Sequence, residues 1–185
     1  MNEKNENGDL KIELTKREYD LLKYVVPTAD PRPGFLRVLV RPGELVSTNG
    51  QKLIVLKKEH EAKSGFYWLA KTSSAKFRNF LFFDKAEIFN QSFPNIDSLI
   101  ERVSKDFVGE FDFTRRTDSL SAILFKVYNK GVCIDFNLFY RLPAVGELFS
   151  LYAEPGVLVR FKFSDFDFYI MPVKVDSEIP KRVGV

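Results

Sequence analysis

Residues 131–175 read GVCIDFNLFYRLPAVGELFSLYAEPGVLVRFKFSDFDFYIMPVKV, and the predicted fold is built around this stretch. Its segments 132–136, 157–163 and 166–175 are rich in aromatic and β-branched residues, which is typical of strands. Between the first two segments, apolar side chains recur at the spacing of one helix face; they are Leu138, Leu142, Val145, Phe149 and Tyr152. The sequence therefore predicts a strand, a helix over 138–152 and two further strands, with the helix packed on the sheet.

The predicted helix has a clear start and stop, but it contains a proline. Asn137 is suited to cap the helix start, and Pro155-Gly156 would end the helix. Pro143 lies too deep to be the first helical residue, so it removes a backbone hydrogen bond. We therefore expect a kink at this position.

The N-terminal part of the chain shows the same order of elements. Thr15-Lys16-Arg17-Glu18 is a capping box, and Asn49-Gly50 is a turn signal. The predicted elements are strands at 11–14, 35–40 and 45–58, the last divided near residue 49, and a helix at 15–26. Because 131–175 begins with the same order, the pattern indicates two copies of one unit.

The remaining segments predict a single domain over 11–175 with an insertion near 60–119; two trimmed domains are the alternative. Residues 1–10 are expected to be a disordered tail, and 176–185 form a second polar tail. The pattern predicts strands at 65–70 and 120–128, a short helix at 96–103 and a loop or edge strand at 106–116. It leaves 76–83 open as helix or strand.

The composition is that of an ordinary soluble protein: 45% of residues are apolar and 29% are charged, and the net charge is +3. A charge of this size allows a nucleic-acid partner but does not require one. Cys133 is the single cysteine, so an internal disulfide is excluded. No apolar run approaches the length of a membrane span, and we expect a cytoplasmic protein with no membrane partner.

Catalytic chemistry has few candidates in this sequence. His60 is the only histidine and lies in a charged run, while Cys133 lies among apolar residues. Asp165 and Asp167 would face one side of a strand, and an exposed edge explains them more simply than an acid–base or metal site. No nucleophile elbow or glycine-rich phosphate loop is present. We expect no enzyme activity, no catalytic residue, no cofactor and no metal.

Three short motifs resemble segments of the bacterial sliding clamp, the β subunit of the replicative DNA polymerase, and they occur in the family's order. STNGQKL at 47–53 is similar to A-T-D-G-H-R-L, and SFPNID at 92–97 is similar to R-F-P-D-Y. IMPVKV at 170–175 is similar to the closing strand V-M-P-M-R-L. The resemblance implies an α+β fold: two β-α-β-β halves with antiparallel sheets, and two helices side by side on one face. A clamp subunit carries three such domains, so this chain would be a shortened form.

In the family, these motifs line a hydrophobic cleft that grips short peptides of polymerases and other replication proteins. The resemblance therefore implies a partner-peptide cleft formed by Thr48, Gly50, Gln51, Lys52, Leu53, Pro94, Leu99, Met171 and Pro172. The alternative is that Leu53, Leu99 and Met171 are plain core residues.

The family's helices line a ring and touch double-stranded DNA through phosphates, without reading the base sequence. The matching residues on the two predicted helices are Lys16, Arg17, Lys23 and Arg141. Asp20 weakens this patch, and a solvated helix face explains these charges equally well.

The resemblance implies a non-catalytic clamp-like protein, such as a processivity factor, that would need several copies to form a ring. The alternative is a clamp-derived interaction module that forms no ring and binds no DNA.

Overall fold

The computed structural model describes residues 11–71, 79–83, 93–112, 117–135, 137–144 and 146–173, so both expected tails lie outside the described residues. Along the chain, the elements are β1 (Lys11–Leu14), α1 (Lys16–Val25), the 3₁₀ helix η1 (Pro33–Leu36), β2 (Val38–Arg41), β3 (Glu44–Thr48), β4 (Lys52–Lys57), β5 (Gly65–Lys71), β6 (Asn79–Phe83), α2 (Ile96–Glu101), β7 (Phe107–Asp112), α3 (Thr117–Asn129), α4 (Asn137–Tyr140), β8 (Leu148–Tyr152), β9 (Val159–Lys162) and β10 (Phe166–Ile170).

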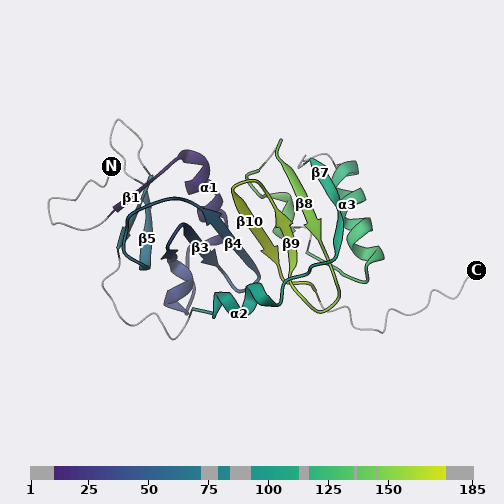
Figure 1. Ribbon diagram of the computed structural model, residues 1–185, viewed down its shortest axis with the longest axis horizontal. Coiled ribbons are helices and arrows are strands. Elements are labelled where there is room, and N and C mark those ends of the chain that lie inside the picture. Colours follow the sequence, from purple (N-terminus) through teal and green to yellow (C-terminus); the bar gives the residue numbers. More distant parts are fainter. Residues whose placement is uncertain are drawn as a thin grey trace, which may run out of the picture.

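The ten described strands form one sheet in the order β1-β6-β5-β2-β3-β4-β10-β9-β8-β7, and all neighbouring strands are antiparallel. The sheet has two halves, each with a strand, a helix and a three-stranded meander. The first half is β1, α1, β2, β3 and β4, with the hairpin β5–β6 placed between β1 and β2; the second is β7, α3, β8, β9 and β10. The halves meet where β4 pairs with β10 at the centre of the molecule (Figure 1).

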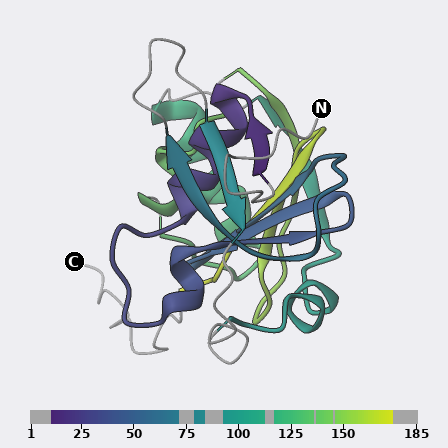
Figure 2. The same ribbon diagram turned by 90° about the vertical axis from the view of Figure 1, so that its left-hand side faces the viewer.

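Alternate residues of the central strands supply two separate cores, because successive side chains of a strand point to opposite faces. On β4, Ile54 and Leu56 join the larger core, whereas Leu53 and Val55 join the smaller one. Helices α1, α3 and α4 contribute to the larger core, and α2 contributes to the smaller. The two long helices therefore lie on one face of the sheet and α2 lies on the other, and Figure 2 shows α1 and α2 on opposite sides.

The predicted start of α1 is confirmed. The Thr15 hydroxyl accepts a hydrogen bond from the Glu18 N–H (3.2 Å), and the Thr15 N–H donates to the Glu18 carboxylate (2.7 Å). The two bonds satisfy two backbone N–H groups that have no partner within the helix. The helix buries Leu21, Leu22 and Val25 against the sheet and ends before Pro27.

The helix predicted over 138–152 is wrong. Among the described residues of this stretch, only α4, a single turn at Asn137–Tyr140, is helical, and Leu148–Tyr152 form strand β8. Pro143 interrupts the helical hydrogen bonds, and Gly146 has a φ of +87°, which favours glycine and breaks the helix. In β8, Phe149 and Leu151 are both buried, which is the period of a strand.

The helix of the second half is α3, where the sequence predicts a strand at 120–128. Leu120, Ile123 and Val127 are its buried residues, at the spacing of one helix face. Exposed apolar residues between them, such as Phe125, hide this period in the sequence. The strand predicted at 132–136 is also wrong in its described part, because residues 132–135 have no regular structure.

The fold class is confirmed with these corrections: α3, and not 138–152, is the second helix on the shared face. The strand at 65–70, the turn at Asn49-Gly50 and the short helix near 96 are also confirmed. Residues 33–36 form η1 where the sequence predicts a strand beginning at 35. Residues 60–119, treated above as an insertion, supply β5, β6 and β7 to the same sheet.

The capping box predicts a measurable contribution to stability. Replacing Thr15 by alanine removes the hydroxyl that accepts from the Glu18 N–H, so we expect the free energy of unfolding to fall by about 1 kcal/mol. Thr15→Ser keeps a hydroxyl and should stay within about 0.3 kcal/mol of the wild type. Urea unfolding measures both variants, and equal stability of the alanine and serine variants would contradict the assignment.

Candidate functional site

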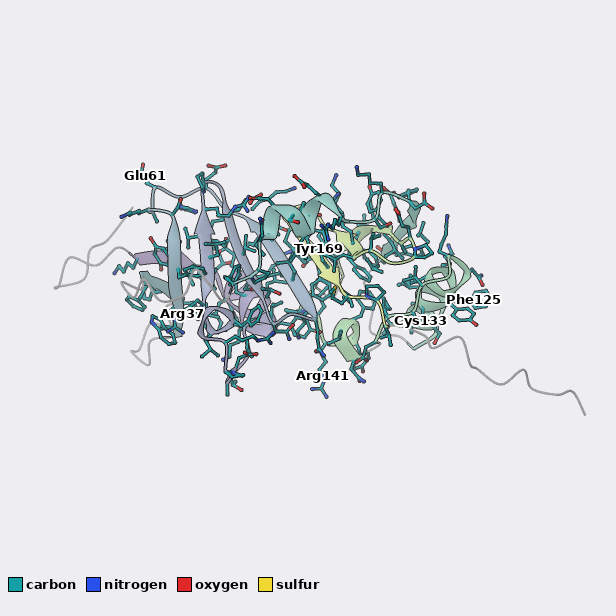
Figure 3. All side chains as sticks on the ribbon, turned by 90° about the horizontal axis from the view of Figure 1, so that it is seen from below. Arg37, Glu61, Phe125, Cys133, Arg141 and Tyr169 are labelled. Carbon is teal, nitrogen blue, oxygen red and sulfur yellow. The ribbon has the colours of Figure 1, made fainter. Side chains whose placement is uncertain are left out.

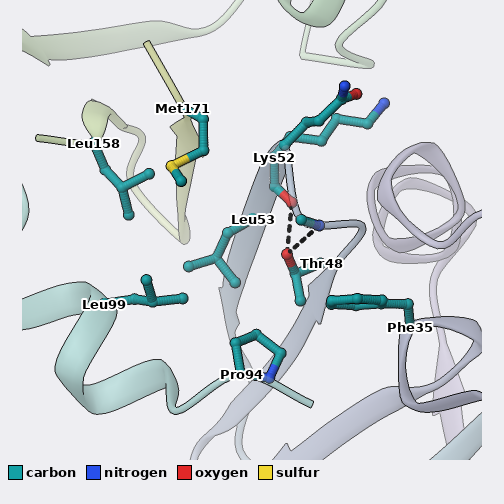
Figure 4. A pocket seen from close by; sticks show the side chains of 10 residues that line it. Phe35, Thr48, Lys52, Leu53, Pro94, Leu99, Leu158 and Met171 are labelled. Carbon is teal, nitrogen blue, oxygen red and sulfur yellow. Dashed lines mark hydrogen bonds between the residues drawn. The ribbon is translucent and has the colours of Figure 1, made fainter. Parts of the chain in front are cut away.

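A cavity of about 170 Å³ lies on the face of the smaller core, beside the β4–β10 pairing. Eight of the nine residues predicted for the peptide cleft line it, and Pro172 does not. The cavity is lined by Phe35, Thr48, Gly50, Gln51, Lys52, Leu53, Pro94, Leu99, Leu158 and Met171 (Figure 4). The structure thus brings together predicted residues as far apart in the sequence as Thr48 and Met171.

The turn between β3 and β4 holds one wall of this cavity through its own side chains. The Thr48 hydroxyl donates to the Lys52 carbonyl (2.9 Å) and accepts from the Gly50 N–H (3.1 Å). The Asn49 side-chain oxygen accepts from the N–H groups of Gln51 and Lys52, both at 3.0 Å. Gly50 has a φ of +87°, a conformation that glycine adopts without strain. The turn is therefore rigid, and its backbone donors are satisfied internally.

The opposite wall comes from α2 and the segment before it. Asn95 caps α2 by accepting a hydrogen bond from the Ser98 N–H (3.1 Å), and this fixes Pro94 and Leu99 beside the cavity. Two lining residues, Phe35 and Leu158, are absent from the sequence prediction. Phe35 belongs to η1, and the proline-glycine pair directly before it is the signal that could have indicated a helical turn there.

Met171 lies at the mouth of the cavity. Its N–H donates to the Gln51 carbonyl (2.9 Å), which extends the β4–β10 pairing by one step, while 47% of Met171 is exposed to solvent. Leu53, by contrast, is buried, and Leu99 is half-buried. The plain-core alternative therefore fits Leu53 but does not fit Met171.

The four residues predicted to contact DNA divide into two groups. Lys23 and Arg141 line a second cavity of about 560 Å³ together with Tyr24, Lys52 and Asn137. This cavity lies on the face of the larger core, because Lys52 points to the same side of β4 as Ile54. Lys16 and Arg17 do not line it, so the structure brings together only half of the predicted set.

Arg17 is held by two carboxylates from the second half of the chain. Its Nε donates to Glu147 (2.9 Å), and its terminal nitrogens bond Asp165 and Glu147. These hydrogen bonds, with that to Glu147 first, raise the pKa of Arg17 above its usual value. Lys16 is exposed and forms an ion pair with Asp20 one turn along α1. The charge of Arg17 is thus balanced within the protein, and its role is to join α1 to the β9–β10 turn.

Lys52 is half-buried in the second cavity, whereas Lys23 and Arg141 are exposed. The Lys52 Nζ lies 3.5 Å from the centre of the Tyr24 ring, and burial together with the charge of Arg141 lowers the pKa of Lys52 to about 8. The Tyr24 hydroxyl donates to the Leu138 carbonyl (2.7 Å), and burial raises the pKa of Tyr24 to about 12. No carboxylate in the described part of the chain forms an ion pair with Lys23, Lys52 or Arg141.

The residues considered for catalysis are dispersed. Asp165 bonds Arg17, and Asp167 is buried on the other face of the sheet, where Arg160 donates to it (3.0 Å). The two aspartates therefore do not face one side, contrary to the expectation. Within the described ranges no group of three or more histidine, cysteine, aspartate or glutamate side chains is placed to hold a metal ion. No helix in these ranges is long and apolar enough to cross a membrane.

Comparison with known proteins identifies the fold. No protein-family model matches the sequence, and no curated protein matches it. Among solved structures, the β subunit of DNA polymerase III from Borrelia burgdorferi superposes with a TM-score of 0.57 at 10% identity, covering 90% of this chain and 64% of its own. The sliding clamp of Bacillus subtilis gives a TM-score of 0.56 at 12% identity, with coverages of 95% and 67%.

A third neighbour is the Helicobacter pylori beta clamp bound to a DNA ligase peptide, with a TM-score of 0.52 at 12% identity and coverages of 89% and 66%. The chain thus spans about two thirds of the length of these neighbours. At this identity the likeness concerns the fold alone, and it extends over nearly the whole chain. The chain has the fold of the bacterial sliding clamps over about two thirds of their length.

Proposed function

We propose that the protein is a non-catalytic, clamp-like protein whose cleft binds a short peptide of a replication protein. The observation that carries this proposal is the cavity beside the β4–β10 pairing, which gathers eight of the nine residues expected for such a cleft. The neighbour from Helicobacter pylori that binds a DNA ligase peptide supports the kind of partner.

The chemistry of the cavity suits an apolar peptide anchor. Its lining includes aliphatic and aromatic side chains such as Leu53, Leu158 and Phe35, and the exposed Gln51 lies at its rim. Burying one leucine-sized or phenylalanine-sized side chain contributes about 1.5–3 kcal/mol.

A single charge at the mouth of the cleft should weaken this binding. In Met171→Glu, a carboxylate replaces the exposed thioether, and the apolar peptide would have to bury it, so we expect the affinity to fall by about tenfold or more. Val173→Glu is the matched control, because Val173 is 50% exposed, lies two residues away and does not line the cavity.

Fluorescence anisotropy with a labelled peptide carrying leucine and phenylalanine anchors measures both variants. The control variant should bind within about twofold of the wild type, because an exposed charge outside the cavity changes the affinity little. Equal weakening by both glutamates, or no binding by the wild type, would reject the cleft as the peptide site.

A second function, contact with double-stranded DNA, is favoured by the cationic cavity on the other face. Lys23 and Arg141 come together there, on the face that carries α1 and α3, and no described carboxylate pairs with them. Cations of this kind hold phosphates without reading bases, as sliding requires. Lys16 would contribute at the far end of α1, while Arg17 drops out of the proposed set because Glu147 and Asp165 hold it.

Encircling DNA would require more than one copy of the chain. The described sheet is open and ends at β1 and β7, so a ring would have to join these edges between copies. A chain with this structure that does not assemble into a ring would be the alternative, an interaction module that binds no DNA. The oligomeric state in solution, measured by light scattering, separates the two: the ring requires an oligomer, and a monomer leaves the interaction module.

Charge reversal on the cationic face should change the salt dependence of DNA binding. For Lys23→Glu with Arg141→Glu, we expect the slope of log affinity against log salt to fall by about two, because about 0.9 is lost for each phosphate contact. Lys57→Glu with Lys162→Glu changes the net charge equally on exposed positions of the opposite face and should keep the slope. An equal fall of the slope in both double variants would show that DNA binding depends only on the net charge of the protein.

A further inference from the structure

Lys52 takes part in both cavities, with different parts of the residue. Its carbonyl accepts the hydrogen bond from Thr48 behind the peptide cleft. Its side chain leaves on the other face of the sheet and lies against the Tyr24 ring of α1. Figure 4 shows this side chain pointing away from Leu53 and Leu99. An anion held by the Lys52 ammonium group would therefore lie on the helical face and not in the peptide cleft.

Three cations from three different elements converge on the helical face. Lys23 is in the last turn of α1, Lys52 begins β4, and Arg141 directly follows α4. Figure 3 shows Arg141 at the molecular surface with its side chain directed outward. Elsewhere Arg17, Lys58 and Arg160 are held by carboxylates, but these three cations have no ion-pair partner among the described residues. The positive charge of Arg141 acts on Lys52, and an anion bound between them would offset this repulsion.

We propose that this cavity is a phosphate-binding site and that Lys52 is its third cationic ligand, beside Lys23 and Arg141, for a backbone phosphate of double-stranded DNA. A guanidinium fork and two ammonium groups approaching from different sides suit a tetrahedral phosphate. Asn137 adds an amide to the same cavity. The inference rests on the proposed DNA contact. It extends that contact to a residue of a strand, in addition to the residues expected from the helices.

The site should respond to pH through Lys52. The charged and titratable groups that face it are Arg141 and Lys23, with Tyr24 in contact and Asp135 acting on Tyr24. The pKa of Lys52 is lowered to about 8 without ligand, and a phosphate favours its charged form. Binding is then strongest below pH 8 and weakens as the pH rises through that value. Tyr24, with its pKa raised to about 12, stays neutral throughout this range.

The test compares the full-length wild type with Lys52→Arg and Lys52→Met, using a fluorescent DNA duplex at about pH 7 and about pH 9. At one pH unit above the pKa, loss of the charged form lowers the affinity by up to about tenfold. The DNA affinity of the wild type should therefore fall by about five- to tenfold between the two pH values. Arginine stays charged at both pH values, so the DNA affinity of Lys52→Arg should change by less than about twofold between them. Lys52→Met should bind weakly at both pH values, with no pH dependence.

Two controls keep the result specific. Lys57→Met removes a cation from the same strand on the opposite face, and it should retain the full pH dependence of the wild type. Peptide affinity is measured on the same Lys52 variants, because this residue also lines the cleft, and it should not follow the pH dependence of DNA binding. Loss of peptide binding instead of DNA binding would assign the cation to the peptide site and overturn the proposal.

The remaining outcomes separate this inference from the function on which it rests. If the Lys23 and Arg141 double variant loses DNA but Lys52→Arg titrates like the wild type, Lys52 is not a ligand and the DNA contact stands. If the wild type binds no duplex, both fail. A free phosphate ion has the same chemistry as a DNA backbone phosphate, and inorganic phosphate is the probe for this alternative ligand. Phosphate that binds at millimolar concentration in a Lys52-dependent manner, without duplex binding, would overturn the assignment to DNA.

Discussion

The antiparallel pairing of β4 with β10 is the interaction on which the rest of the structure depends. It runs from Lys52 opposite Ile170 to Leu56 opposite Phe166, and it joins the two halves into one sheet. Because side chains alternate along a strand, this register sends Leu53 toward the peptide cleft and Lys52 toward the helices. A slip of one residue would exchange the two faces and remove both cavities. The cleft and the cationic site are therefore two consequences of one register.

The first half of the fold is predictable from the sequence because its signals are local. A capping box, a proline after the helix and an Asn-Gly turn each fix a boundary through neighbouring residues. The second half is harder, because the apolar residues of 138–152 fit both a helical and a strand period. Pro143 is the local sign that decides against the helix. In α3, the exposed Phe125 and Tyr128 give a helix the composition of a strand.

The candidate cleft could be predicted because its residues lie in short motifs with distinctive chemistry, such as the turn around Gly50 and the strand end at Met171. The cationic site could be predicted only in part. Reading a helix face in isolation cannot show that Arg17 meets Glu147 and Asp165, more than a hundred residues away. It also cannot show that Lys52 lines the same cavity as Lys23, because that depends on how α1 packs on β4.

Native-state hydrogen exchange of the β4 and β10 amides tests the central claim most directly. If these strands join the halves, the amides of residues 53–56 and 167–169 lie in the middle of the sheet. They should then exchange only through global unfolding, with the same free energy as the inner strands of each half. Exchange of these amides well before those of β3 and β9, with the two halves opening separately, would contradict the account.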